Sequence, residues 1–127
     1  MLLRASIFIT LFVLHLSCKK ETTSGTNVDL GSGTWRISYY WDQADKTYNY
    51  TNYYFMFLSG GTLMAHGSSS TITGTWNQTD SRINITFSNP AVSDLNGNWL
   101  KTELTNSSIK LKNDSPTQDD QLHFVKN

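Results

Sequence analysis

The chain has 127 residues, and its ten lysine and arginine residues balance ten aspartate and glutamate residues, so the formal net charge is zero. This length suits one domain of modest size, and the neutral balance argues against nucleic-acid binding, which needs an excess of positive charge. The single cysteine excludes an internal disulfide and a cysteine-based metal site.

The N-terminal segment has the pattern of an export signal. Arg4 precedes an apolar run over residues 7–14, which is too short to span a bilayer, because a membrane-spanning helix needs about 20 residues. Ser17 and Cys18 follow, and the sequence then becomes polar over residues 19–26. This arrangement resembles the signal of a bacterial lipoprotein, in which a small residue precedes a cysteine that is acylated and becomes the mature N-terminus. His15 departs from that pattern, which prefers an aliphatic residue three positions before the cysteine.

The resemblance implies a signal peptide over residues 1–17, fatty acyl chains such as palmitate on Cys18, a solvated tether over residues 18–30 and a domain over residues 31–127. Each buried methylene of an acyl chain contributes about 0.8 kcal/mol, so several chains would hold the domain to a membrane. Lys19 and Lys20 stand where an aspartate retains enterobacterial lipoproteins at the inner membrane. This favours the outer membrane of the cell envelope and leaves the facing side open. The alternative is an ordinary secretory signal with an incidental cysteine.

From residue 33 onward, apolar and polar residues alternate with the period that predicts β-strands. In chain order, the expected strands cover residues 35–41, 48–58, 62–66, 71–76, 82–87, 99–104, 109–112 and 122–125. In the first strand Trp35, Ile37, Tyr39 and Trp41 share one face, which we expect to point inward, while Tyr40 lies on the other face. An asparagine, a proline and a final glycine within residues 89–97 predict one short helical turn near 90–96.

The strand pattern predicts an all-β protein. Eight short strands with connections of mostly two to six residues indicate an antiparallel meander. Closure into a barrel removes the exposed edges, and eight strands is a favoured number for small barrels. An immunoglobulin-like sandwich is the alternative, but it needs longer crossover connections than this sequence offers. We therefore expect an eight-stranded antiparallel meander closed into a β-barrel.

One tripeptide occurs twice, as Gly33-Thr34-Trp35 and as Gly74-Thr75-Trp76. The first copy resembles the Gly-x-Trp signature of lipocalins, whose tryptophan closes the barrel floor. With Tyr-Phe-Met-Phe, Gly-Gly-Thr-Leu and Leu-Asn-Gly-Asn-Trp, residues 31–126 are similar to small lipocalin-like lipoproteins of Bacteroidetes-type bacteria. The second lipocalin signature, Thr-Asp-Tyr, is absent, because Thr79-Asp80 is followed by Ser81. The resemblance implies a lipocalin-like (calycin-type) barrel whose closure involves Gly33, Trp35, Gly74 and Trp76.

Aromatic residues are concentrated at the start of the domain. Ten of the sixteen lie between Trp35 and Phe57, including all six tyrosines. Tyrosine combines an apolar ring with a polar tip, so such a cluster at the barrel mouth would suit a small apolar or amphipathic ligand. The expected ligand-binding residues are Tyr39, Trp41, Tyr48, Tyr50, Tyr53 and Phe55. The alternative is that these rings fill a small core, because aromatics also favour strands and an eight-stranded barrel has little interior space.

A second hypothesis for the function follows from that alternative. A filled barrel would serve as a structural or protein-interaction module on the cell envelope, with Tyr40 and Tyr54 as outward contact residues for an unknown partner. We expect no metal site, because His66 and His123 have no acidic residues at ligand spacing. No cofactor motif and no set of nucleophile, acid and base is present, so we do not expect an enzyme.

Overall fold

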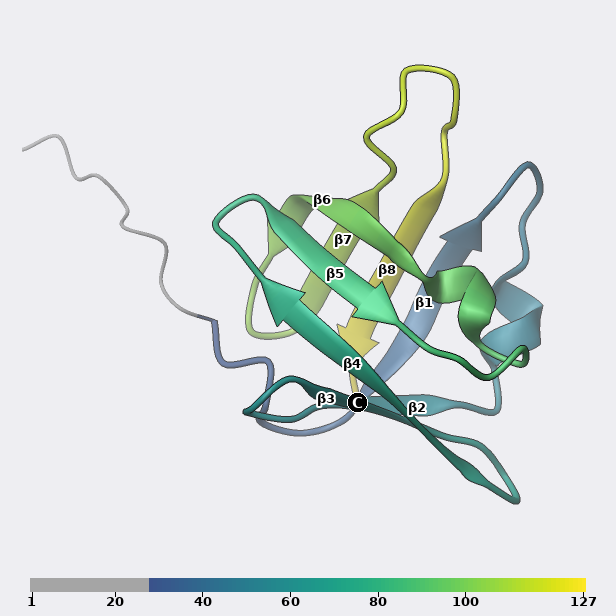
Figure 1. Cartoon of the computed structure of the whole chain (residues 1–127), viewed down its shortest axis with the longest axis vertical. Coiled ribbons are helices and arrows are strands. Elements are labelled where there is room, and N and C mark those ends of the chain that lie inside the picture. Colours follow the sequence, from purple (N-terminus) through teal and green to yellow (C-terminus); the bar gives the residue numbers. More distant parts are fainter. Residues whose placement is uncertain (1–27) are drawn as a thin grey trace, which may run out of the picture.

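The computed structural model describes residues 28–127, which form a closed antiparallel β-barrel of eight strands. Each strand pairs with the next along the chain, and the last pairs with the first (Figure 1). The strands are β1 (Trp35–Trp41), β2 (Tyr54–Phe57), β3 (Thr62–His66), β4 (Thr71–Gln78), β5 (Arg82–Thr86), β6 (Gly97–Leu104), β7 (Ser108–Lys112) and β8 (Gln121–Lys126). The predicted all-β meander and its closure into an eight-stranded barrel are confirmed. The predicted signal peptide and Cys18 lie outside the described residues.

Two 3-10 helices interrupt the strands. The helix η2 (Ser93–Leu95) confirms the helical turn expected near 90–96. The helix η1 (Thr47–Tyr50) was not expected, and the strand predicted over residues 48–58 is shortened to Tyr54–Phe57. The side chain of Asp45 accepts hydrogen bonds from the backbone and the hydroxyl of Thr47 (2.9 and 2.6 Å), which holds the chain in a turn here. No helix of the described residues is long and apolar enough to cross a membrane.

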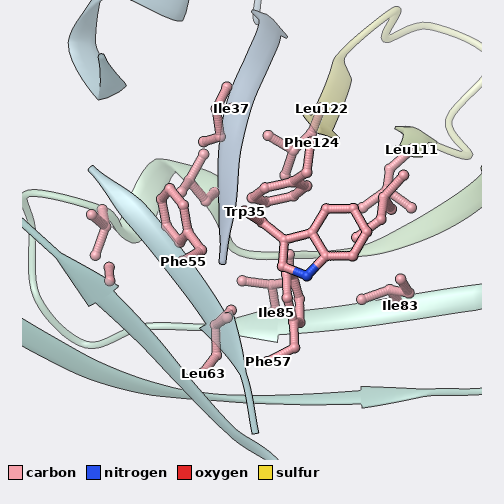
Figure 2. Packing of buried hydrophobic residues seen from close by; sticks show 14 of the residues in the cluster. Trp35, Ile37, Phe55, Phe57, Leu63, Ile83, Ile85, Leu111, Leu122 and Phe124 are labelled. Carbon is pink, nitrogen blue, oxygen red and sulfur yellow. The ribbon is translucent and has the colours of Figure 1, made fainter. Parts of the chain in front are cut away.

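The interior of the barrel is filled by side chains from all eight strands. At its centre the ring of Phe124 makes T-shaped contacts with the rings of Phe55 and Phe57, at centroid distances of 5.4 and 5.5 Å, and the ring centroids of Trp35 and Phe57 are 6.4 Å apart (Figure 2). Edge-to-face contacts of this kind are favourable beyond the area that they bury. The interior of the barrel is therefore occupied by the protein's own rings, in line with the alternative that aromatic residues fill a small core.

The two ends of the barrel differ. At the closed end, Leu30 is 1% exposed and its carbonyl accepts a hydrogen bond from the indole of Trp35 (3.1 Å). The indole of Trp76 donates in the same way to the carbonyl of Leu58 (2.9 Å). The two tryptophans of the repeated tripeptide thus tie connections to the barrel wall. Leu30, which the sequence assigned to the tether, is instead part of the core. The opposite end, the mouth end, carries the connections over residues 42–53, 67–70, 87–96 and 113–120.

Candidate functional site

A β-bulge in β1 changes which aromatic residues reach the interior. The register against β8 shifts between Ile37 and Tyr39, so the alternation of side chains reverses beyond that point. Tyr40 therefore points inward and is 2% exposed. Tyr39 lies outside against His123, with ring centroids 5.2 Å apart, and Trp41 lies opposite the exposed Gln121. The prediction that Tyr39 and Trp41 face inward is wrong, and so is the prediction that Tyr40 is an outward contact residue.

The six predicted ligand-binding residues do not form one wall. Tyr39 and Trp41 are on the outer surface of β1, and Tyr48 projects into solvent from η1 with 72% of its surface exposed. The other three, Tyr50, Tyr53 and Phe55, extend the core. Their rings form a series that starts at Tyr40, with centroid distances of 5.5 Å from Tyr40 to Tyr50, 6.3 Å from Tyr50 to Tyr53 and 6.3 Å from Tyr53 to Phe55. None of the six lines the polar cleft at the mouth end, and Tyr40 is the one aromatic residue of β1 that does.

The mouth end contains a cleft of about 410 Å³. Residues from β1, β5, β6, η2 and the connection between β7 and β8 meet there. The lining consists of Tyr40, Asp42, Arg82, Asp94, Asn96, Gly97, Asn98, Trp99, Asn113, Asp114 and Asp120. Tyr40 and Trp99 are buried in the barrel and support this lining from the core side. The indole of Trp99 donates to the carbonyl of Leu95 (2.9 Å), which holds η2 beside the start of β6.

The cleft has an excess of negative charge, because four aspartates accompany a single arginine. Arg82 forms an ion pair with Asp114 and donates to the carbonyl of Asn98 (3.2 Å). Asp42 pairs with Lys46 at 2.6 Å. Within residues 28–127, Asp94 and Asp120 have no lysine or arginine at ion-pair distance. The cleft therefore disfavours anions and offers carboxylates and amides to a hydrogen-bonding neutral or cationic molecule.

Tyr40 connects the core to the cleft. Its hydroxyl donates a hydrogen bond to the backbone carbonyl of Asp94 (2.9 Å) and so joins β1 to η2. Burial, reinforced by the negative charge of Asp42, raises the pKa of this phenol well above its ordinary value. Burial and the charge of Asp94 raise the pKa of Tyr50 to about 12. Both phenols are neutral at physiological pH, so Tyr40 acts in the cleft as a hydrogen-bonding and packing group.

The raised pKa values predict a loss of stability at alkaline pH. Unfolded tyrosine titrates near pH 10, whereas Tyr50 holds its proton to about pH 12 in the folded state. Above about pH 10 the unfolded state binds fewer protons than the folded state, so the free energy of unfolding falls as pH rises, by at most about 1.4 kcal/mol per pH unit for each tyrosine. Urea unfolding at intervals of about one pH unit between pH 8 and pH 11 measures how steeply the free energy of unfolding falls with pH. The Tyr50→Phe variant is expected to have a shallower slope, and an unchanged slope would contradict the assignment.

The two histidines of the described chain lie on the outer surface, away from the cleft. His66 stacks on Tyr54 at 4.6 Å, and its Nδ1 lies 2.9 Å from the hydroxyl of Thr71. Desolvation, aided by the nearby charge of Lys110, lowers the pKa of His123. Among residues 28–127, no three histidine, cysteine, aspartate or glutamate side chains gather as a metal site would require.

Sequence reasoning missed the cleft, although one signal for it was present. Alternate connections of an up-and-down meander meet at the same end of a barrel. The connections at the mouth end contain Asp42, Asp94 and Asp120, together with the asparagines at 96 and 113. Considered together, these polar residues indicate a hydrophilic mouth, whereas the aromatic residues alone suggested an apolar one.

The fold and the cleft define a class of protein: a small, filled, eight-stranded antiparallel β-barrel that carries a polar cleft at one end. No known protein-family model matches the chain. No curated protein matches it either.

Two solved structures resemble the barrel. A DUF4847 family protein from Bacteroides vulgatus aligns with a TM-score of 0.57 at 16% identity, covering 78% of this chain and 95% of its own. An uncharacterized protein from Bacteroides eggerthii aligns with a TM-score of 0.55 at 15% identity, covering 76% of this chain and 99% of its own. At these identities the likeness shows the fold alone.

Proposed function

We propose that this chain is a lipid-anchored protein of the bacterial cell envelope that binds a small polar molecule in the cleft at the mouth of a lipocalin-like barrel. The observation that carries the proposal is the cleft itself, whose volume of about 410 Å³ lies within the usual range of small-molecule sites. The anchor is supported by the lipoprotein-like pattern that ends at Cys18. The same pattern, followed by Lys19 and Lys20, supports placement at the outer membrane.

The composition of the cleft supports a polar ligand instead of the apolar one expected from the aromatic residues. Eight of its eleven lining residues are aspartate, asparagine or arginine, and rings fill the barrel beneath it. A molecule with several hydroxyl or amino groups would match these hydrogen-bonding side chains. We propose binding without a chemical reaction, because the sequence offers no recognisable set of nucleophile, acid and base, and Arg82, the one arginine of the lining, is already paired with Asp114.

A matched series of probes tests the ligand class. Glucosamine, glucose and gluconate have similar sizes but carry positive, zero and negative charge. We expect binding to weaken in that order, since the cleft has four aspartates against one arginine. Titration followed by NMR or calorimetry measures the three affinities. If none of the three binds at millimolar concentration, the proposed cleft function is wrong.

Two adjacent aspartates provide the control for this experiment. Asp120 lines the cleft, whereas Asp119 is exposed and does not line it. The Asp120→Asn variant is expected to weaken glucosamine binding roughly fivefold, equivalent to about 1 kcal/mol. The Asp119→Asn variant makes the same charge change outside the cleft and should bind as the unaltered protein does. Equal weakening by both variants would indicate a diffuse charge effect and would argue against a site in the cleft.

A second candidate function is a protein-interaction module, and the outer surface of β2 and β3 favours it. Tyr54 is 41% exposed and stacks on His66, while Met56 and Met64 are paired beside them on the same surface. Exposed tyrosine and methionine are enriched at interfaces. Cross-linking in whole cells tests this candidate: a covalent partner that is lost in the Tyr54→Ala variant would support it, and recovery of the monomer alone would count against it.

A further inference from the structure

We infer that the closed end of the barrel faces the membrane and that the cleft opens away from it, toward the aqueous compartment. This inference rests on the proposed anchor at Cys18. It adds to the proposed function the direction from which the ligand arrives. A ligand dissolved in the aqueous phase would enter freely, whereas a lipid within the same bilayer would have to leave the membrane and pass along the barrel.

The first observation is the point at which the described chain joins the barrel. Leu30 is 1% exposed, and its carbonyl accepts the hydrogen bond from the indole of Trp35. Asp29 then accepts a hydrogen bond from the backbone of Gly31 (2.8 Å). The described residues before β1 run along the closed end, beside the C-terminus (Figure 1). The attachment point of the preceding segment is therefore held by the core.

The C-terminus reinforces this attachment. The backbone N–H of Asn127 donates to the carbonyl of Thr34 (2.9 Å), and the ammonium group of Lys126 lies 5.0 Å from the ring of Trp35. These contacts join the last strand to the residues just before β1. Both ends of the described chain are consequently secured at the same end of the barrel, opposite the cleft.

The second observation is the distance between this attachment and the cleft. β1 runs from Trp35 at the closed end to Trp41 at the mouth end, a length of about 20 Å at 3.3 Å per residue. Residues 19–27 separate Cys18 from Val28, and a chain spans at most about 3.6 Å per residue, so that Val28 lies within roughly 36 Å of the acylated residue. To place the mouth end at the bilayer, more than half of this maximum reach would be used up along the length of the barrel, whereas the closed end can lie at the bilayer at any shorter separation.

The third observation is charge. The cleft residues Asp94 and Asp120 have no cationic partner within residues 28–127. An anionic membrane surface repels such carboxylates within a Debye length, which is about 8 Å at physiological ionic strength. The mouth-end connections contain six aspartates and one lysine, whereas the closed-end connections of the described chain contain only Asp29 and Asp80 as charged side chains, so electrostatics favours the same orientation as the position of the tether.

Fluorescence quenching on vesicles tests the orientation. The acylated mature protein is placed in vesicles of phosphatidylcholine and phosphatidylglycerol that carry a headgroup quencher. A fluorescent amino acid replaces either Asn106, in the exposed closed-end connection, or Asp119, in the exposed mouth-end connection. We expect loss of fluorescence from the label at position 106 and retention of fluorescence from the label at position 119. Equal or stronger quenching at position 119 would overturn the inferred orientation.

Two further variants distinguish a failure of the proposed anchor from a failure of the inferred orientation. Cys18→Ser should abolish co-flotation with the vesicles. If the unaltered protein does not float, the anchor of the proposed function is wrong, and the orientation falls with it. If it floats but the labels show the reverse order, only the orientation is wrong. Insertion of a Gly-Ser segment of about 20 residues before Asn27 lengthens the tether and should reduce the difference between the two labels.

Discussion

Replacing Trp35 by alanine is expected to lower the free energy of unfolding by about 3–5 kcal/mol, the usual cost of truncating a buried tryptophan. Trp35 is completely buried, makes a T-shaped contact with Phe57 and donates a hydrogen bond to the carbonyl of Leu30. Its loss leaves a cavity and an unpaired carbonyl at the closed end. Because small domains have a total stability of about 5–15 kcal/mol, this variant should approach the limit of folding. Urea unfolding at neutral pH measures the change.

The second copy of the tripeptide supplies the matched control. Trp76 also donates to a backbone carbonyl, that of Leu58, and contacts Phe57 at 5.3 Å, but it is only partly buried. Trp76→Ala should therefore cost less, about 2 kcal/mol. Trp35→Phe retains much of the packing and removes the hydrogen bond, which separates the two contributions. If Trp76→Ala proved as costly as Trp35→Ala, the closed end would not depend on Trp35 in particular.

The sequence predicted the barrel well because most strands follow simple alternation. Ile83 and Ile85 on β5, and Leu122 and Phe124 on β8, are all at most 2% exposed, as their spacing indicated. Short connections then leave few ways to arrange eight strands other than a meander. The predicted order therefore required no knowledge of distant contacts.

The orientation of the residues at the end of β1 required such knowledge. The bulge between Ile37 and Tyr39 depends on pairing with β8, which lies more than eighty residues along the chain, and the hydroxyl of Ser38 there bonds the carbonyl of His123 (3.4 Å). A strict alternation placed Tyr39 and Trp41 inside and Tyr40 outside, whereas the bulge reverses all three. The cleft could not be predicted for a similar reason, because its lining combines Asp42, Asn98 and Asp120 from segments far apart in the sequence.

Replacing Gly74 by alanine is the second change with a large expected effect. A β-carbon at this position would lie 2.4 Å from Cδ1 of Phe87 and 2.5 Å from the carbonyl oxygen of Thr86. Gly74 thus lets β4 approach the end of β5 and lets the buried ring of Phe87 cover the backbone. Overpacking costs about 1–3 kcal/mol, and we expect the upper end of that range, because one of the two clashing groups is backbone. Thermal unfolding should show a decrease in Tm of roughly 15 °C.

A double-mutant cycle identifies which clash dominates. Phe87→Leu removes the aromatic ring but leaves the carbonyl of Thr86 in place, so Gly74→Ala should cost less in the Phe87→Leu background without becoming neutral. Thr73→Ala and Thr75→Ala change exposed neighbours on the same strand and should shift Tm little. Should Gly74→Ala prove as mild as these two, β4 and β5 would have room to separate. The close approach of β4 to β5 would then not be required for closure of the barrel. At Gly33, the glycine of the first Gly-Thr-Trp copy, the reason for glycine is different, because the backbone there has a positive φ of 85°.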